Sequence, residues 1–214
     1  IIRNLVEGAQ FLHSHILWMY NLAGLDYVNP LNALSADAAD AYDLAAELGT
    51  PSADFVGLQD RLKKFADNGQ LSIFSGNWFD TGEYNMTPEA DLILTAHYLE
   101  ALQMQSKASE IAALLGGKMP HIMTIVPGGT AFVPTAEKLD DLKGLVDEVY
   151  QWVADTMIPD TLAIAKYYPE ATTFGKGVGR YAAWGVFENA FDEGTSYADR
   201  MRNRYMPAGV LDEN

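Results

Sequence analysis

The sequence predicts a mainly α protein, a bundle of long helices with minor strand and loop segments. Apolar residues recur every three or four positions along three long stretches, which is the spacing of one helical face. Two of these stretches follow strong helix-start signals. Hydrophobic residues make up 49% of the 214 residues and charged residues 20%, as in an ordinary globular protein. We find no internal repeat, linker or low-complexity tract, so we expect residues 1–214 to form a single helical domain.

The first long helix should span residues 1–27. Apolar residues step by three or four positions from Ile2 to Ala23, so the helical periodicity is already running at the first residue. Nothing that resembles an N-cap precedes it. We therefore expect the chain to begin inside a helix and to be a piece of a longer polypeptide, with processing or trimming as the alternative origin of this end.

Two shorter helices are predicted next. One runs from Ser35 to Gly49, because Gly49 can adopt the left-handed conformation that ends helices. The other begins with Ser52 as its N-cap and ends at Asn68-Gly69. Its expected buried stripe is Phe55, Leu58, Leu62 and Phe65.

The periodicity breaks between residues 70 and 86. Apolar residues in this stretch predict a short strand or an aromatic plug in a loop, namely Ile73, Phe74, Trp78 and Phe79. Thr87-Pro88-Glu89 then combines a capping hydroxyl, a proline at the first helical position and an acid in the first turn. These signals predict a second long helix over residues 88–115, ended by Gly116-Gly117.

Residues 119–134 are predicted to be extended or loop, with a turn at Gly128-Gly129. Thr135 caps a third long helix over residues 135–157, which Pro159 should interrupt. Its packing stripe is predicted to be Leu139, Leu142, Val146, Val149 and Val153. Beyond Pro169 the chain is rich in glycine and aromatic residues and has weak periodicity.

Charge and composition exclude several functions. The formal net charge is -15, with 14 Lys and Arg against 29 Asp and Glu, so neither nucleic acid nor an anionic membrane surface is an expected partner. The most apolar stretch, residues 11–28, is broken by polar side chains, so no membrane-spanning helix is expected. The absence of cysteine excludes disulfides, thiolate metal sites and a cysteine nucleophile within this chain.

The histidines give few local signs of chemistry. His13 and His15 are two residues apart, which places them about 200° apart on a helix, so they cannot chelate one metal ion. His97 lies in the middle of a predicted helix and is interpreted as a core histidine with satisfied hydrogen bonds. The glycine-rich segment from Gly175 to Arg180 lacks the third small residue of a dinucleotide fingerprint and the final Ser or Thr of a P-loop.

The segment from Gly116 to His121 is more unusual. Two glycines end a long helix, and Pro120 then restricts the approach to His121. Such a backbone can aim Lys118 and His121 in definite directions. The local alternative is a helix terminator with incidental side chains.

Several segments, taken together and in order, resemble the large, catalytic subunit of nickel–iron hydrogenases. The matching segments are Ile2-Arg3-Asn4-Leu5 through His13-Ser14-His15 to Leu25-Asp26-Tyr27, Arg61-Leu62-Lys63-Lys64-Phe65 with Gly69-Gln70-Leu71, Pro88-Glu89-Ala90, His97-Tyr98-Leu99-Glu100-Ala101-Leu102, and Gly116-Gly117-Lys118-Met119-Pro120-His121 with Gly128-Gly129. The resemblance extends over nearly the whole chain.

The resemblance implies reversible splitting of H2 into protons and electrons in an intact enzyme. Family large subunits carry one Cys-x-x-Cys motif near each end, and these thiolates hold nickel and an iron that bears cyanide and carbon monoxide. This chain resembles the central fragment between the two motifs, so it ligates none of the nickel–iron centre and should be inactive alone. Its four histidines cannot replace soft thiolates.

The resemblance also implies roles for three residues and one partner. Ser14 corresponds to the residue above the active site, which is aspartate in many uptake enzymes. A serine hydroxyl can form hydrogen bonds there but is not a charged acceptor, so the proton-handling role of that aspartate does not carry over directly. His121, with Lys118 beside it, corresponds to the interface with an iron–sulfur small subunit, close to the nearest cluster. A hydrogen-bond donor there can tune the potential of the cluster. H2 and protons are the implied substrates.

Two alternatives stay open at the level of sequence. Ser14-His15-Ile16-Leu17 also resembles a helix of the quinone-site subunit of respiratory complex I. A metal-free helical interaction or structural module is the alternative from another class, supported by the absence of cysteine. The resemblance to uptake enzymes favours the periplasmic side of the bacterial cytoplasmic membrane, with the cytoplasm as the alternative.

Overall fold

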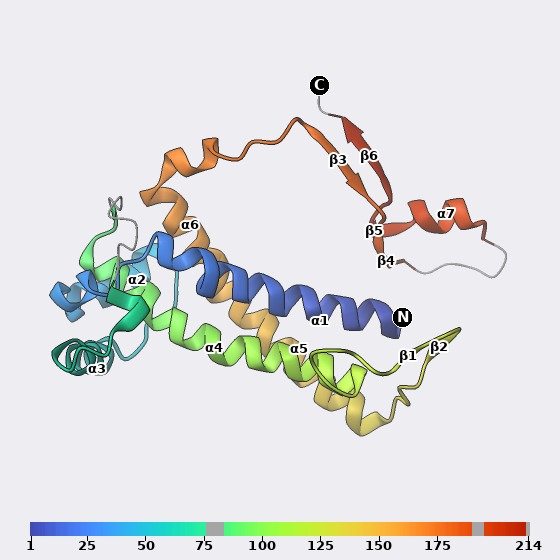
Figure 1. Cartoon of the computed structure of the whole chain (residues 1–214), viewed down its shortest axis with the longest axis horizontal. Helices are drawn as coiled ribbons and strands as arrows, with labels where there is room; N and C mark the ends of the chain where they lie inside the picture. The colour runs from blue at the N-terminus through green and yellow to red at the C-terminus, as the bar shows by residue number, and fades with distance from the viewer. Residues whose placement is uncertain (76–83, 190–194, 213–214) are drawn as a thin grey trace.

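The structure is a computed structural model that describes residues 1–75, 84–189 and 195–212 (Figure 1). Its helices are α1 (Ile2–Ile16), α2 (Ala38–Leu48), α3 (Phe55–Asp67), α4 (Pro88–Gly116), α5 (Ala136–Trp152), α6 (Ile158–Tyr167) and α7 (Tyr197–Arg202). Its strands are β1 (Ile125–Val126), β2 (Gly129–Thr130), β3 (Arg180–Ala183), β4 (Val186–Glu188), β5 (Arg204–Met206) and β6 (Gly209–Asp212). The predicted mainly α class is confirmed.

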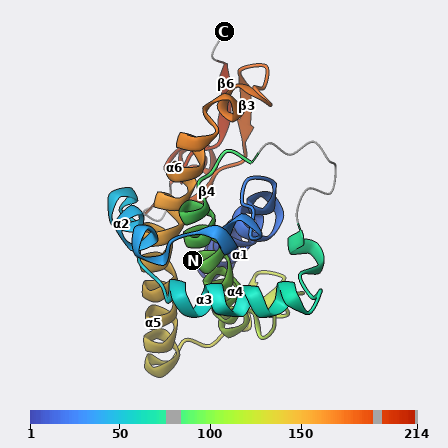
Figure 2. The ribbon, with the colours of Figure 1, turned by 90° about the vertical axis from the view of Figure 1, so that its left-hand side faces the viewer.

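Two long helices form the centre of the molecule. α1 and α4 lie side by side and run in opposite directions (Figure 1). α1 continues through a π-helical turn, Leu17–Ala23, and a 3-10 turn, Gly24–Asp26, so the helical segment matches the predicted range 1–27. α5 and α6 pack along the same pair, while α2 and α3 lie across the N-terminal half of α4 (Figure 2).

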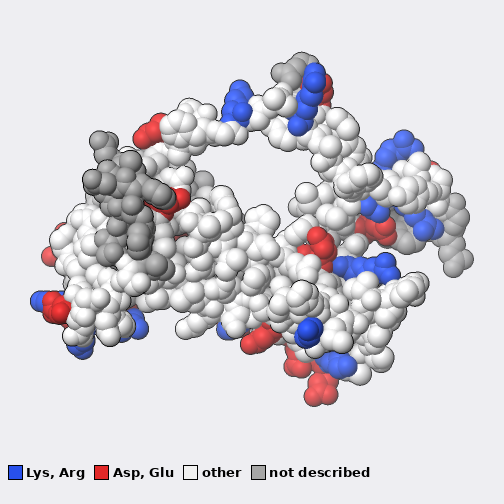
Figure 3. Space-filling view, in the orientation of Figure 1, with Lys and Arg blue, Asp and Glu red and all other residues white. Residues whose placement is uncertain are grey.

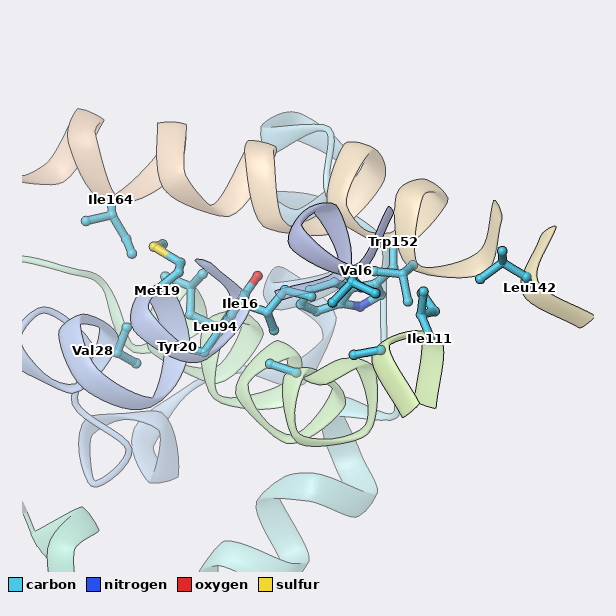
Figure 4. Packing of buried hydrophobic residues seen from close by; sticks show 14 of the residues in the cluster. Val6, Ile16, Met19, Tyr20, Val28, Leu94, Ile111, Leu142, Trp152 and Ile164 are labelled. Carbon is cyan, nitrogen blue, oxygen red and sulfur yellow. The ribbon is translucent and has the colours of Figure 1, made fainter. Parts of the chain in front are cut away.

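The core explains why α4 can be so long. All residues from Ala90 to His97 are buried, because α1, α2 and α3 approach this half of the helix from different sides. A main cluster joins α1, α4, α5 and α6 around Ile16, Ile111 and Trp152 (Figure 4). A second cluster joins α2 and α3 to the start of α4. A helix with neighbours on several sides is stabilised by packing along its whole length.

The predicted start of the first short helix at Ser35 and the predicted N-cap of the second at Ser52 were wrong. α2 begins after Asp37, whose carboxylate accepts the N–H of Ala39 at 2.8 Å, and not at Ser35. The Ser35 hydroxyl instead donates to a carbonyl within its own 3-10 turn. α3 is capped by Asp54 and not by Ser52. A carboxylate both accepts the free N–H groups and opposes the positive end of the helix dipole, so the aspartates are the better caps.

The predicted helix ends are confirmed, but two predicted stripes are only partly buried. Gly49 and Gly69 have positive φ values of 69° and 65° at the ends of α2 and α3. Phe65 is exposed in the last turn of α3, where it borders an open pocket between α3 and α4. On α5, Leu142 and Val149 are buried whereas Leu139 and Val146 are exposed. α5 packs mainly against α4, and α3 packs against α4, α2 and the 3-10 turn Asn32–Ser35, so the residues that point away from these neighbours stay exposed.

Pro159 does not interrupt the third long helix, contrary to the prediction. A π-helical turn, Val153–Met157, leads directly into α6, and Pro159 occupies the first turn of α6. The wider turn rearranges the backbone hydrogen bonds where proline has no N–H to donate. Helical structure therefore continues to Tyr167.

The irregular segments agree with the prediction where they are described. Residues 72–75 form a 3-10 turn, and the ring of Phe74 packs edge-on against Tyr98 as a plug would. Trp78 and Phe79 lie outside the described residues. β1 and β2 form a small hairpin around Gly128, whose φ is 84°.

A C-terminal arm, residues 174–212, extends from the helical body, and its strand β4 returns to contact α1 (Figure 1). Within it β3 pairs with β6 and β4 pairs with β5, both antiparallel, and α7 lies between β4 and β5 in the chain. No helix or strand was predicted for this segment, because its hydrophobic pattern is too irregular. Over the described part of the chain, no helix has the length and apolarity needed to cross a membrane.

Candidate functional site

A charged cluster lies at the centre of the helical body. His97 of α4 and Asp160 of α6 are fully buried, and the Nδ1 atom of His97 is 2.9 and 3.0 Å from the two carboxylate oxygens of Asp160. The Nε2 atom of His97 is 3.0 Å from the carbonyl oxygen of Pro51. A carbonyl can only accept, so Nε2 must carry a proton.

The geometry favours the doubly protonated form of His97. Burial alone would lower the pKa of His97, but the hydrogen bond and negative charge of Asp160 outweigh it, so this pKa lies above its usual value. We therefore describe the pair as a buried imidazolium and carboxylate. The interpretation of His97 as a satisfied core histidine is confirmed.

Two hydroxyl groups also donate hydrogen bonds to the carboxylate of Asp160. Tyr20 donates to one carboxylate oxygen at 2.6 Å, and Thr50 donates to the other at 3.0 Å. Burial, followed by the charge of Asp160, raises the pKa of Tyr20, so its phenol stays protonated. Because all these groups are already paired, the cluster fixes the positions of α4, α6 and the loop after α2 and has no free base for proton transfer.

A second buried carboxylate holds the loop before α2. Asp91, in the first turn of α4, accepts the backbone N–H of Asn29 and the side-chain amide of Asn32, each at 2.8 Å. Burial raises the pKa of Asp91 to about 6, although both hydrogen bonds act in the opposite direction. This carboxylate is therefore partly protonated just below neutral pH.

The segment that carries Lys118 and His121 is tied down at several points. The N–H of Met123 donates to Gly116 at 2.8 Å, and the Thr124 hydroxyl donates to Leu115 at 2.7 Å. The Arg3 guanidinium donates to two carbonyl groups of the hairpin, Val126 at 2.8 Å and Gly129 at 3.2 Å.

The side chains of Lys118 and His121 are both exposed. His121 has a positive φ of 65°, an unusual conformation for a residue with a side chain. The structure thus holds this segment in one shape with its two basic residues at the surface.

The other sequence candidates lie apart from this segment. Ser14 is exposed on α1, at the end opposite to Arg3. His13 is half-buried, and the Nδ1 atom of exposed His15 lies 2.8 Å from the Phe11 carbonyl. The structure therefore does not bring Ser14 and His121 into one pocket.

The segment from Gly175 to Arg180 does not form a phosphate loop. It is exposed and leads into strand β3, whereas a phosphate loop leads into a helix N-terminus.

Comparison with known proteins identifies the family. The sequence model of the nickel-dependent hydrogenase family matches residues 1–214. The chain belongs to the nickel-dependent hydrogenase family. It is 35% identical over 192 residues to the Hydrogenase-2 large chain of Escherichia coli K12, a match covering 84% of this chain and 34% of that protein. It is 34% identical over 230 residues to the Hydrogenase-1 large chain of the same organism, covering 99% and 37%.

Solved structures support the same fold. The chain resembles the Ni-Fe-Se hydrogenase of Desulfovibrio vulgaris Hildenborough with a TM-score of 0.69, over 99% of this chain and 34% of that one, at 23% identity. It also resembles the [NiFeSe]-hydrogenase of Desulfomicrobium baculatum, with a TM-score of 0.64 at 25% identity, over 99% and 35%. The chain spans about a third of the length of these hydrogenase relatives.

The residues of this hydrogenase chain do not fit a nickel–iron centre. The sequence has no cysteine, and the described residues contain no group of three His, Cys, Asp or Glu side chains that could hold a metal ion. His97 and Asp160 are close together, but both His97 nitrogens are already hydrogen-bonded. No catalytic step through nickel can therefore be assigned to these residues.

The partners of His97 were missed in the sequence analysis. Asp160 follows Pro159 on an otherwise apolar helix face, and a lone acid on such a face is a signal that could have drawn attention. Tyr20 and Thr50 carry no such signal, because their spacing in sequence gives no reason to place them against Asp160. Asp91 was not singled out from the sequence, and its hydrogen bonds with Asn29 and Asn32 were not predicted.

Proposed function

We propose that this chain is the central, scaffold part of the large subunit of a nickel-dependent hydrogenase that catalyses reversible oxidation of H2 to protons and electrons. The match of the family model to all of residues 1–214 carries the proposal. Identities of 34–35% to two Escherichia coli hydrogenase large chains support it. The same matches favour hydrogenase over a complex I subunit and over an unrelated helical module.

In this proposal the metal ligands lie in parts of the large subunit outside these 214 residues. Thiolates on both sides of the segment would hold nickel and the iron with its cyanide and carbon monoxide ligands. This chain contributes the rigid helices, which the His97–Asp160 pair fixes in position. The relatives are named large chains and large subunits, which supports a smaller companion subunit. In this proposal the companion carries iron–sulfur clusters.

Two surface regions receive roles in the proposed assembly. Ser14 would lie above the active site, where its hydroxyl can form hydrogen bonds but has no charge to accept a proton. Lys118 and His121 would face the small subunit, and their exposure on a tied segment supports this assignment. We also propose a location on the periplasmic side of the cytoplasmic membrane, because two relatives are named uptake hydrogenases.

The function is tested by comparing the 214-residue chain with the complete large subunit, produced with its small subunit and maturation proteins. The complete assembly should bind nickel and reduce a viologen dye with H2, and the chain alone should do neither. Reading the gene beyond both ends of the segment gives an independent check, since a Cys-x-x-Cys motif is expected on each side. Stoichiometric nickel in the purified chain alone, or a gene without those motifs, would contradict the proposal.

A further inference from the structure

An apolar pocket lies between α3 and α4, where α3 crosses the N-terminal half of α4 (Figure 2). Its volume is about 300 Å³, at the lower end of the range for small-molecule sites. Every residue that lines it lies within residues 30–99 of this chain. Its apolar walls are formed by Leu58, Leu62 and Phe65 of α3, by Tyr98 and Leu99 of α4, and by Phe74. The pocket lies apart from the few Lys and Arg side chains of the C-terminal arm, which Figure 3 shows on the other side of the molecule.

Hydrogen bonds outside the pocket hold two of its walls in place. The side-chain amide of Gln59 in α3 donates to the Ala36 carbonyl at 2.8 Å, which ties α3 to the chain before α2. Asp91 accepts hydrogen bonds from Asn29 and Asn32, and these two residues flank Pro30, which also lines the pocket. A pocket with tied walls is pre-formed, so binding requires little reorganisation of the protein.

The rim of the pocket carries an available positive charge. Arg61 and Gln70 line the pocket, and both are exposed. Within the part of the chain that the structure describes, the Arg61 guanidinium makes one long hydrogen bond, from Nε to the Gly57 carbonyl at 3.4 Å, and contacts no carboxylate. The planar fork of an arginine matches a carboxylate through two parallel hydrogen bonds. The rim therefore favours a ligand with a carboxylate group.

The buried side of the pocket carries an unsatisfied hydroxyl group. Thr95 lines the pocket and is 5% exposed, and its hydroxyl has no hydrogen-bond partner among the described residues. A buried polar group without a partner costs free energy, which a ligand that supplies the partner recovers. Rotation about the Cα–Cβ bond of Thr95 exchanges its hydroxyl and methyl groups, so the hydroxyl can turn into the pocket without breaking a hydrogen bond.

We propose that this pocket binds a small aromatic carboxylate with a hydroxyl group at the far end of its ring. The carboxylate pairs with Arg61 at the rim, and the hydroxyl pairs with Thr95 at the buried side. The ring packs against Phe65 and Phe74, because aromatic rings attract one another beyond the area that they bury. Phe74 already makes such an edge-on contact with Tyr98, at a centroid distance of 5.4 Å. The site uses no metal, so the inference does not rest on the proposed function.

Calorimetric titration of the complete large subunit, assembled with its small subunit, tests the proposal with three probes. 4-Hydroxyphenylacetate has both polar groups, phenylacetate lacks the hydroxyl, and tyramine carries an ammonium group in place of the carboxylate. We expect saturable binding of 4-hydroxyphenylacetate and about tenfold weaker binding of phenylacetate. Tyramine should not bind saturably, because Arg61 repels its charge. Equal binding of the three probes, or no saturable binding of 4-hydroxyphenylacetate up to about 10 mM, would overturn the proposal.

The 214-residue chain provides a second measurement with the same probes. It should bind 4-hydroxyphenylacetate with the affinity of the complete assembly, because all lining residues belong to it. Binding by the chain but not by the assembly would show that the pocket is filled in the complete protein, and would refute the proposal.

A matched pair of variants tests whether Arg61 holds the carboxylate. Arg61→Gln should weaken the binding of both acids at least tenfold. Lys63→Gln is the control, because Lys63 is exposed on α3, two residues from Arg61 and outside the lining of the pocket, and it should leave both affinities unchanged. Equal affinities in the two variants would place the probe elsewhere. H2 oxidation without probe should be native in both variants, so a failure of binding is distinguishable from a failure of the proposed function.

Thr95→Val tests the buried end of the site. This variant should bind 4-hydroxyphenylacetate no more tightly than phenylacetate, and its affinity for phenylacetate should be native. Its melting temperature without probe should be native or higher, because the lost hydroxyl had no partner among the described residues. A lower melting temperature, or native discrimination between the two acids, would show that the hydroxyl of Thr95 does not serve the ligand and would contradict the proposal.

Discussion

Asp160 accepts the Nδ1–H of His97 with both carboxylate oxygens, at 2.9 and 3.0 Å, in the centre of the helical body. The two residues are 63 positions apart in the sequence, and their contact joins α4 to α6. Both side chains are buried, so each charge depends on the other for its compensation. The pair fixes one packing of α4 against α6, because sliding either helix would separate the charges.

Removing either partner should therefore destabilise the chain strongly. We expect His97→Gln and Asp160→Asn each to lower the free energy of unfolding by about 3–5 kcal/mol, because each leaves an uncompensated buried charge. The double variant should lose less than the sum of the two single losses, since no lone charge remains. Urea unfolding of all four proteins measures this coupling, and additive losses would show that the two charges do not interact.

The same pair predicts a pH dependence of stability. Because the folded pKa of His97 is raised above its unfolded value of about 6.5, the pair contributes fully below pH 6.5 and is lost as pH rises through the folded pKa. The unfolding free energy of the native chain should thus decline on the alkaline side, and His97→Gln should lack this component. His15→Gln, at an exposed histidine, is the control and should keep the native pH profile.

The titration of Asp91 should give the unfolding free energy a second pH dependence, at lower pH than that of His97. Its folded pKa, raised to about 6 by burial, exceeds the unfolded value of 3.8. The folded state therefore binds the proton more tightly, and stability should fall as pH rises from about 4 to 6, by roughly 2 kcal/mol. Asp91→Asn should remove this slope, whereas Asp60→Asn on the exposed face of α3 should not. An unchanged slope in Asp91→Asn would show that another group titrates.

Two glycines in different surroundings should respond in opposite ways to substitution by alanine: Gly116 at the end of α4 and Gly144 in the middle of α5. A Cβ on Gly116 would lie 2.4 Å from Cδ1 and 2.8 Å from Cγ2 of Ile122, so Gly116→Ala should destabilise the chain by about 1–3 kcal/mol. Gly144 lies exposed in the middle of α5 with open space around its Cα, so Gly144→Ala should stabilise by about 0.5–1 kcal/mol. Denaturant unfolding measures both, and a neutral Gly116→Ala would show that Ile122 moves freely.

Features set by residues close together in the sequence were predictable, whereas features set by distant residues were not. Local signals placed α4 correctly, because Thr87 caps it and Gly117 ends it within a few residues of chain. Where two nearby residues could both cap a helix, the sequence did not show which one does so: Asp54, and not Ser52, caps α3. Burial of a stripe depends on what packs against it, so Leu139 could not be assigned from spacing alone.

In the candidate site, too, only features set by neighbouring residues in the sequence could be predicted. The exposed position of His121 follows from local chain chemistry, since glycine and proline fix the backbone around it. The contacts of Asp160 with Tyr20 and Thr50 join residues 140 and 110 positions apart. No local pattern encodes such pairings, because they arise only when the helices meet.

His121 provides the last prediction, in the assembled enzyme of the proposed function. Its backbone has a φ of 65°, hydrogen bonds around Gly116 and Thr124 tie down the segment, and the imidazole is exposed at the surface. A hydrogen-bond donor placed against a cluster of the small subunit would tune the potential of that cluster. We expect His121→Ala to shift the cluster potential or slow electron transfer while nickel content stays at the native level. Redox titration followed by electron paramagnetic resonance measures the potential, and His15→Ala serves as a control at another exposed histidine. A native potential with native electron transfer in His121→Ala would return this residue to the role of a helix terminator with an incidental side chain.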